Sequence, residues 1–536
     1  MNKFIVKLSF VILLFVGALL NVFPQNFMDL KDDIYSYIDT WHDEGILKNL
    51  PSVRPYPPQL IVKFLNRVKA RGTVVDKEIA AYYLRKMEGA KAFKASVTAL
   101  ANTTVAKDRS SGVASLVYNF QYYLTPSVMA GGNVRVNLLD RPDGEVFPYG
   151  FRRDYDFIED GASVTWGSKT FDVRQGIYTF FSIYTDKIRF QSGMVRTSFG
   201  PFFDDGAIVS SDAPMAGHFS FLWELPGFNY FALFLNLSAS TNRGTGRFPG
   251  KYFFLHGLRF FVAPWLDVSI LESVVWGKRL ELLYLMPAAI LFDSQGIVGF
   301  YDNSLLGITA GVSLGNVHIP LVFYADDLQF SDMAAFHFNT KYKFSFQTGI
   351  SWAPTIPLVK TLSLNYLMVT PYMYTHCSNE GIPGTSGYSN YVNYQNYTHL
   401  ATNLGPGVQP NSDRTRVDIV FLPRAFFRIN LFSQLIRHGN ASEGYSSGDG
   451  TIFDDGWISQ NEHIFSHLRF LTQDRINYVW QFGLNGNYLH IPLFGMLELG
   501  LKAGFVWQTS YVMDKAKGCT DLENNQFVDL GVSLSY

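Results

Sequence analysis

The chain has 536 residues, a formal net charge of −1 and only two cysteines, Cys377 and Cys519. The near-neutral charge excludes nucleic acid as a partner, because binding to phosphates needs a clustered excess of Lys and Arg. Two cysteines cannot build a disulfide scaffold, although one bridge between them stays open. Aromatic residues make up 16% of the chain, with 47 Phe and 30 Tyr, which is typical of a barrel with aromatic girdles at both membrane interfaces.

Residues 1–25 have the pattern of a signal peptide. Lys3 and Lys7 supply the positive start, and the apolar run 8–20 is too short to span a bilayer comfortably. Cleavage after Ala18 or after Gln25 fits this pattern, and an uncleaved anchor is the alternative. No later stretch approaches 18 uninterrupted apolar residues, which argues against a helical membrane protein.

Residues 26–90 predict a small domain of three short helices. The first carries an apolar stripe at Ile34, Ile38 and Trp41. The proline-rich break at 50–58 ends this helix and opens the next, because proline is tolerated in the first turn of a helix but not in its interior. The other two helices have apolar residues at helical spacing: Leu60, Ile61, Phe64, Leu65 and Val68, then Ile79, Tyr82, Tyr83 and Met87. Helices this short are individually marginal, so we expect them to pack on each other or on something larger.

Residues 91–536 change to a period of two, which is clear from about residue 94. Leu362, Leu364, Tyr366 and Met368 alternate with mostly polar residues, and so do Leu497 to Trp507 and Ala425 to Leu431. In a strand, such alternation places one apolar and one polar face. A soluble sandwich also alternates, but its exposed face is rarely so rich in Gly, Ser and Asn.

The last strand distinguishes these two folds. Val528, Leu530, Val532 and Leu534 alternate with polar residues up to the terminal Tyr536, and this pattern resembles the assembly signal of bacterial outer-membrane barrels. Lipid forbids open sheet edges, so the sheet must close. We therefore predict an all-β transmembrane barrel of roughly 16–18 antiparallel strands, with a small N-terminal α-helical domain in the periplasm. The polar stretches 376–416, 437–464 and 513–526 are predicted as its long, outward-facing loops.

Several blocks in a fixed order resemble the capsule-assembly (Wzi-like) family of outer-membrane proteins. They are residues 37–45 (Tyr-Ile-Asp-Thr-Trp-His-Asp-Glu-Gly), 50–56 (Leu-Pro-Ser-Val-Arg-Pro-Tyr), 188–193, 199–201, 210–214, 276–277, 286–287, 302–303, 324–327, Tyr366, 370–376, 397–399, 404–405 and 410–414. Gly407-Val408-Gln409 and Met373 depart from the family's pattern. The resemblance implies an 18-stranded barrel, a periplasmic helical bundle that helps to plug it, and binding of surface polysaccharide.

The predicted glycan-binding residues combine aromatic rings with amides, carboxylates and imidazoles. Aromatic faces stack on sugar rings and polar groups exchange hydrogen bonds with hydroxyls, while repetition along a polymer supplies avidity. The predicted residues are Tyr374, His376, Tyr397, His399, Asn411, Asp413, Arg414, Asp326 and Asp327. The alternative is that such residues only brace and solvate long loops, and that acidic pairs such as Asp204-Asp205 are satisfied by Arg424, Arg428 or water.

Three other patterns favour structural roles. His218-x-Ser220 could pair a base with a nucleophile, but Phe219, Phe221 and Trp223 occupy the other face, so the pair is predicted to face the lumen without a group to orient the base. His376, Cys377 and His399 match no zinc spacing. Arg54 is expected to bond carbonyl groups in its turn. We predict no catalytic residue, metal or cofactor.

The sequence thus predicts an outer-membrane protein that binds and organises surface glycan and catalyses no reaction. Its expected partners are surface polysaccharide, outer-membrane lipid and the barrel-assembly machinery, and its oligomeric state stays open. The alternative is a porin whose N-terminal domain grips the cell wall, because the helices also resemble surface-layer homology domains. A porin needs an open lumen, whereas the first interpretation needs a plugged one.

Overall fold

The computed structural model describes residues 29–87, 93–107, 109–140, 146–151, 162–166, 169–287, 289–299, 302–326, 343–376, 391–439, 452–453 and 470–536. The predicted signal peptide lies outside these residues. No helix within these ranges is both long and apolar enough to cross a membrane.

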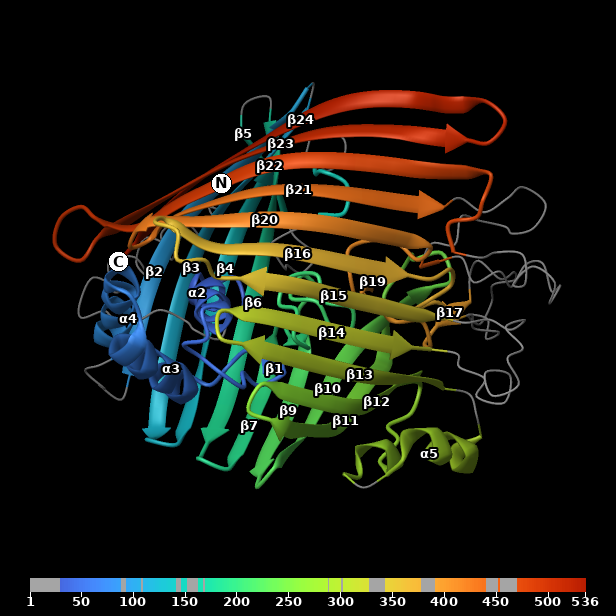
Figure 1. Cartoon of the computed structure of the whole chain (residues 1–536), viewed down its shortest axis with the longest axis horizontal. Helices are drawn as coiled ribbons and strands as arrows, with labels where there is room; N and C mark the ends of the chain where they lie inside the picture. The colour runs from blue at the N-terminus through green and yellow to red at the C-terminus, as the bar shows by residue number, and fades with distance from the viewer. Residues whose placement is uncertain are drawn as a thin grey trace.

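A closed antiparallel barrel of 18 strands makes up most of the molecule (Figure 1). The wall consists, in order around the barrel, of β2 (Phe93–Ala106), β3 (Arg109–Thr125), β4 (Val128–Asp140), β6 (Lys169–Tyr184), β7 (Ile188–Val195), β9 (Ala216–Leu225), β10 (Phe228–Thr241), β11 (Phe248–Ala263), β12 (Leu266–Gly277), β13 (Asn303–Leu314), β14 (Val317–Ala325), β15 (Phe344–Trp352), β16 (Val359–Val369), β20 (Ser412–Arg424), β21 (Phe427–Gly439), β22 (Arg475–Pro492), β23 (Glu498–Asp514) and β24 (Gly518–Ser535). The predicted fold class and the predicted strand number of 16–18 are both confirmed.

The last strand closes the barrel on the first. β24 pairs with β2 from Thr98↔Ser535 to Ala106↔Phe527, so neither strand keeps an open edge. Leu530 and Val532 of β24 are exposed on the outer surface, whereas the intervening Gly531 and Ser533 line a cavity inside. Alternation of this kind is what a wall between lipid and a polar interior requires.

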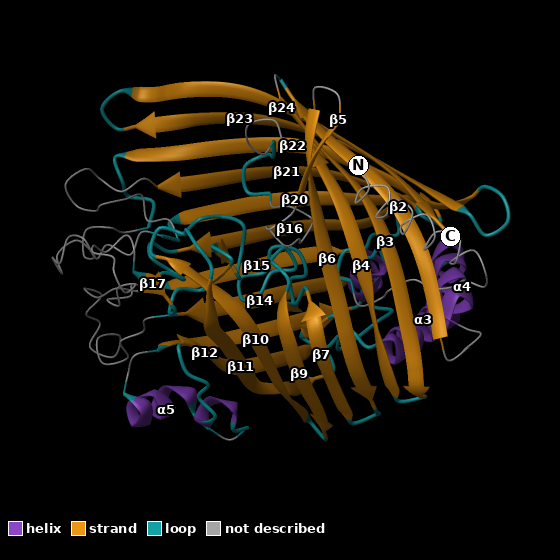
Figure 2. Ribbon diagram, turned by 180° about the vertical axis from the view of Figure 1, so that it is seen from behind, coloured by secondary structure: helices purple, strands orange, loops and turns teal. Residues whose placement is uncertain are grey.

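The two ends of the barrel differ in the length of their connections. At one end the strands are joined by short turns, such as residues 126–127, 226–227 and 315–316; at the other lie the long connections 196–215, 278–302 and 370–411. We call these the helix end and the loop end, because the N-terminal helices sit at the first (Figures 1 and 2). The stretch 513–526 is not the predicted loop: β23 and β24 run through it and only residues 515–517 turn.

Three N-terminal helices form a compact bundle at the helix end. They are α2 (Ile34–Asp43), α3 (Pro58–Arg71) and α4 (Val74–Met87). Pro58 occupies the first turn of α3, as predicted from the proline-rich break. The apolar stripes of the bundle meet in one core, which also includes Phe426 and Leu489 of the barrel.

Short elements fill the lumen and flank the loop end. They are β1 (Val53–Arg54), β8 (Ser198–Phe199), β17 (Val392–Asn393), β18 (Thr398–His399) and β19 (Thr402–Asn403), with β5 (Ala162–Trp166), η1 (Leu283–Leu285) and α5 (Leu291–Val298) near the loop end.

Candidate functional site: the lumen and the loop end

Ion pairs and hydrogen bonds from several wall strands anchor the helical bundle inside the barrel. Lys360 of β16 reaches Glu44 at 2.6 Å and Asp76 at 2.8 Å. Asp76 is fully buried, and although burial alone raises its pKa, Lys360 and Thr73 together hold that pKa below its usual range. On another side, Arg428 of β21 donates to the Thr40 hydroxyl at 3.0 Å. These contacts fix residues 29–87 as a plug at the helix end.

Arg54 connects the plug to itself rather than to turn carbonyls, so its predicted role is corrected. Its guanidinium bonds Asp39 at 2.6 Å and donates to the Tyr56 hydroxyl at 3.0 Å. Burial raises the pKa of Asp39 to about 6 despite this cation. Burial, aided by the charge of Asp39, raises the pKa of the nearby Asp43 to about 8. The plug therefore contains two acids whose charged forms are disfavoured in the folded state.

The plug also meets a connection that enters from the loop end. β1 of the plug pairs antiparallel with β8, which lies in the connection between β7 and β9. The pairing joins Val53 to Phe199 and Arg54 to Ser198, and the Gly200 amide donates to the Ser52 carbonyl at 2.9 Å. The plug at the helix end and the connection that enters from the loop end are thus joined by main-chain hydrogen bonds inside the lumen.

The long connection 370–411 packs on top of this junction. Tyr374 and Tyr397 are fully buried, and their hydroxyls donate to the carbonyls of Ala207 at 2.5 Å and Ile208 at 3.0 Å. Tyr324 of β14 donates to the Tyr397 hydroxyl at 3.2 Å. These rings belong to an apolar cluster that includes the inward-facing side chains of β10–β14. The lumen beside these strands is therefore a packed core and not a water-filled passage.

A buried ion pair fastens the two inward-folded connections to the wall. Arg414 of β20 pairs with Asp205, and the Asp205 carboxylate also accepts from the Gly407 amide. Gln347 of β15 adds an acceptor for the Ala207 amide at 2.9 Å. Asp205 is thus satisfied by an arginine, but by Arg414 rather than by Arg424 or Arg428, whereas Asp204 accepts from the Ser211 hydroxyl at 3.3 Å.

Three further residues of the predicted site also have protein partners. His399 accepts the Ser238 amide at Nδ1 and therefore donates from Nε2 to the Met215 carbonyl. Asn411 bridges the Gly439 carbonyl and the Leu471 amide. Asp413 is paired with Arg437 and accepts from the Tyr366 hydroxyl.

The structure does not gather the eight described residues of the predicted site at one surface. Tyr374, Tyr397 and His399 lie in the inward-folded connection, while Arg414 and Asp413 are neighbours on β20 with different partners. Asp326 is buried at the end of β14, and the His376 carbonyl accepts from Asn393. Asp327 and Cys377 lie outside the described residues. The glycan contacts of these residues stay a prediction.

His218 and Ser220 face the lumen, as predicted. His218 Nε2 lies 2.8 Å from the Ser220 hydroxyl, and its Nδ1 lies 2.7 Å from the Thr197 hydroxyl, a partner that the sequence did not reveal. The cavity beside Ser220 is about 20 Å³, roughly the space of one water molecule. A substrate does not fit there. In the described part of the chain no group of three or more His, Cys, Asp or Glu side chains has the geometry to hold a metal.

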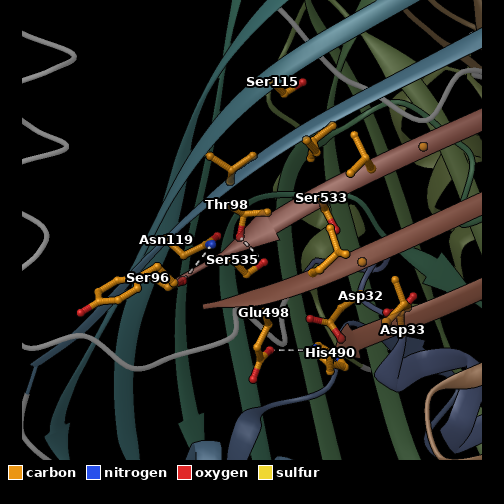
Figure 3. Close-up of a pocket in the computed structure, with 18 of the residues that line it drawn as sticks. Asp32, Asp33, Ser96, Thr98, Ser115, Asn119, His490, Glu498, Ser533 and Ser535 are labelled. Atoms are coloured by element: carbon orange, nitrogen blue, oxygen red, sulfur yellow. Dashed lines mark hydrogen bonds and ion pairs between the residues drawn. The ribbon is translucent and has the colours of Figure 1, made fainter. Parts of the chain in front are cut away.

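One polar cavity of about 490 Å³ lies between the plug and the seam of the barrel (Figure 3). Its walls are the inner faces of β2–β4 and β22–β24, with Ser96, Thr98 and Ser533 among the lining residues. Asp32 and Asp33 of the plug and Glu498 of β23 add acidic groups, with Lys86 and Lys502 as nearby cations. Small inward side chains on the first and last strands leave this space, in contrast to the packed core beside β10–β14.

Three wall or loop features escaped the sequence interpretation: the anchor Lys360, the acceptor Gln347 and the inward course of residues 196–215. Lys360 has the same parity as Leu362 and Leu364, so alternation predicts an outward side chain; a register shift between Val359 and Thr361 changes this. The one available signal was the conspicuous Asp204-Asp205 pair within the block-rich stretch 188–214.

The comparisons with known proteins agree with this architecture. No protein-family model matches the chain, and no curated protein matches it in sequence. Among solved structures, Wzi of Escherichia coli, described as a carbohydrate-binding β-barrel involved in group 1 capsule assembly, aligns with 96% of this chain and 98% of its own, with a TM-score of 0.56 and 13% identity. OprD of Pseudomonas aeruginosa aligns with 83% of this chain and 95% of its own (TM-score 0.43, 10% identity), and OccK8 (OprE) of the same organism with 83% and 98% (0.42, 12%). The predicted resemblance to the Wzi-like barrel is confirmed at the level of the fold.

Proposed function

We propose that this protein is a non-catalytic outer-membrane barrel with a closed lumen, which binds and organises surface polysaccharide at its loop end. The observation that carries the proposal is the pairing of β1 with β8, by which the plug and an inward-folded connection close the lumen together. A porin needs a continuous aqueous path, and the apolar cluster packed beside β10–β14 supports a closed lumen at that side of the barrel. The fold shared with Wzi, itself described as carbohydrate-binding, supports the same function.

We infer the orientation in the membrane from the lengths of the connections. In outer-membrane barrels short turns face the periplasm and long loops face outward. The loop end accordingly faces the cell exterior, and the plug is reached from the periplasm. The stretches 376–416 and 437–464 supply the Tyr, Asn and Asp side chains that suit sugar rings and hydroxyls.

The buried members of the predicted site have a supporting role in this proposal. Tyr374, Tyr397, His399, Asn411 and Arg414 hold the base of the connections through partners inside the protein. A rigid base lowers the ordering cost when a polymer binds to the loops above it.

Retention of native surface polysaccharide tests the proposal. The intact protein in lipid nanodiscs is compared with a variant in which residues 378–389 are replaced by a shorter Gly-Ser linker, and with the control Lys69→Met on the exposed side of α3. We expect the intact protein and the control to retain polymer and the shortened variant to lose it. Failure of the intact protein to retain any polymer refutes the binding function.

The polar cavity favours a second candidate function, passage of a small solute along the barrel seam. The cavity of about 490 Å³ is lined by hydroxyls, amides and charges together with aliphatic side chains such as Leu100 and Val117, and its polar groups suit an aqueous path. Single-channel recording separates the two functions: the closed barrel shows little steady conductance, and deletion of residues 29–87 raises it. A large, stable conductance of the intact protein favours the channel.

A further inference from the structure

The connection between β12 and β13 lies outside the barrel wall. It comprises the described residues 278–287 and 289–299, which include η1 and α5, and we call it the lateral segment. Figures 1 and 2 both show α5 beside the outer surface, near the end at which β12 finishes. Two other long connections, 196–215 and 370–411, instead pack into the lumen.

One side of the lateral segment is packed on outward-facing side chains of the wall. Tyr284 and Leu291 are fully buried against Phe254, Val274 and Trp276. These wall residues face outward, because their neighbours along the strands, such as Phe253 and Val275, belong to the core inside the barrel. The segment is thus stacked on the surface that lipid covers elsewhere around the barrel.

A polar hub fixes the segment in this position. The Asp302 carboxylate accepts from the Tyr284 hydroxyl at 2.5 Å and pairs with Arg279 at 2.6 Å. The Gln295 amide donates to the Asp302 carbonyl at 2.9 Å, and the Trp276 indole donates to the Arg279 carbonyl at 3.1 Å. The segment is therefore a built element, and the side chains on its other side are held where they are.

That other side is mainly apolar and uncovered, with Asp293 as an exposed charged residue among its side chains. Ile297 is 78% exposed, and Ile290, Phe292, Leu282, Leu280 and Met286 are between 52% and 59% exposed. A rigid apolar surface of this kind, facing away from the protein, marks contact with another apolar phase. The outer wall of the same strands is also apolar beyond the outward-facing His256 and Glu272, where Leu258, Phe260 and Ile270 are exposed toward the helix end.

We propose that the lateral segment is embedded in the acyl chains of the outer leaflet, as an in-plane foot on one side of the barrel. The proposal rests on the outer-membrane location of the proposed function. An amphipathic helix of an interfacial element buries its apolar face a few ångströms into the boundary between headgroups and chains. The half-buried Tyr252 beside the segment fits that level, because Trp and Tyr concentrate at membrane interfaces. The foot widens the barrel on one side at the loop end. Its contact with the acyl chains fixes the height and the tilt of the barrel in the leaflet.

Single-cysteine reporters test this position. In a Cys377→Ser/Cys519→Ser background, Ile297→Cys reports on the foot, Leu530→Cys on the outer face of β24, and Val74→Cys on an exposed apolar position of the plug. Each variant is labelled with an environment-sensitive fluorophore and placed in phosphatidylcholine vesicles with brominated acyl chains. We expect bromolipid to quench the labels at 297 and 530, and aqueous iodide alone to quench the label at 74. Met286→Cys serves as a second reporter if labelling at 297 disturbs α5.

The outcomes separate the inference from the function on which it rests. If bromolipid quenches the label at 530 but iodide quenches those at 297 and 286, the foot is in water and the inference fails while the barrel location stands. If the foot reporters are protected from both quenchers, a second copy or another protein covers them, which also overturns the inference. If bromolipid does not reach position 530, the membrane location itself fails.

Discussion

Replacing Lys360 by Met tests how the plug is held in the barrel. The substitution keeps the length of the side chain but removes the cation that serves Glu44 at 2.6 Å and Asp76 at 2.8 Å. Removing one partner of a buried ion pair typically costs roughly 3–5 kcal/mol, because the other charge is left without compensation. Asp76 keeps hydrogen bonds from Trp41 and Thr73, so we expect a loss near the lower end, about 3 kcal/mol.

Hydrogen exchange measures this loss directly. A destabilisation of about 3 kcal/mol raises the fraction of undocked plug on the order of a hundredfold, so the amides of α2 and α4 exchange faster by that factor while those of β22–β24 do not change. Lys69→Met, on the exposed side of α3, serves as the matched control and leaves exchange unaltered. In a double-mutant cycle with Asp76→Asn, the two substitutions are expected to be strongly non-additive. The anchoring role is refuted if the Lys360→Met variant exchanges its plug amides at the wild-type rate. It is also refuted if the effects of Lys360→Met and Asp76→Asn are strictly additive.

Three further predictions follow from other parts of the molecule. Burial raises the pKa of Asp43 to about 8, so the folded plug keeps a proton that the unfolded chain releases near the ordinary pKa of aspartate; stability is full below that ordinary value and falls as pH rises toward about 8. Thermal melting of the plug should show this slope between about pH 4 and about pH 8, and Asp43→Asn should flatten it. His256 and Glu272 are paired at 2.9 Å on the outward side of β11 and β12. We expect Glu272→Leu to lower the melting temperature and the double variant His256→Leu/Glu272→Leu to recover it. An equal loss of melting temperature in the single and the double variant would contradict the pairing. Deletion of residues 528–536 should abolish heat-modifiable migration, because β2 and β23 then lose their partner, and normal assembly of the truncated chain would exclude a closing role for β24.

The sequence by itself determined the class of fold wherever lipid acts on one face of a strand. Leu530, Val532 and Leu534 alternate with small polar residues because one side of β24 meets acyl chains and the other a polar cavity. Helix boundaries were equally local: the start of α3 at Pro58 follows from the chemistry of proline alone. These features need only the immediate neighbours of each residue and the surrounding solvent.

The local pattern fails where the environment of a strand is changed by distant parts of the chain. In β10, Phe231, Leu233 and Leu235 face inward and are as apolar as the outward side, because a folded connection covers them inside. In residues 513–526 the strands continue without alternation of apolar residues. Their polar composition predicted a loop, but every residue outside 515–517 is in a strand.

Only the tertiary structure decided what the candidate residues do. Tyr374 donates to Ala207 and Arg414 pairs with Asp205, across separations of 167 and 209 residues. No periodicity indicates such partners, since they depend on two long connections entering the same lumen and on the plug meeting them from the other end. Tyr, Asp and Arg have the same composition whether they bind a sugar or brace a loop, and only burial together with the identity of their partners distinguishes the two roles.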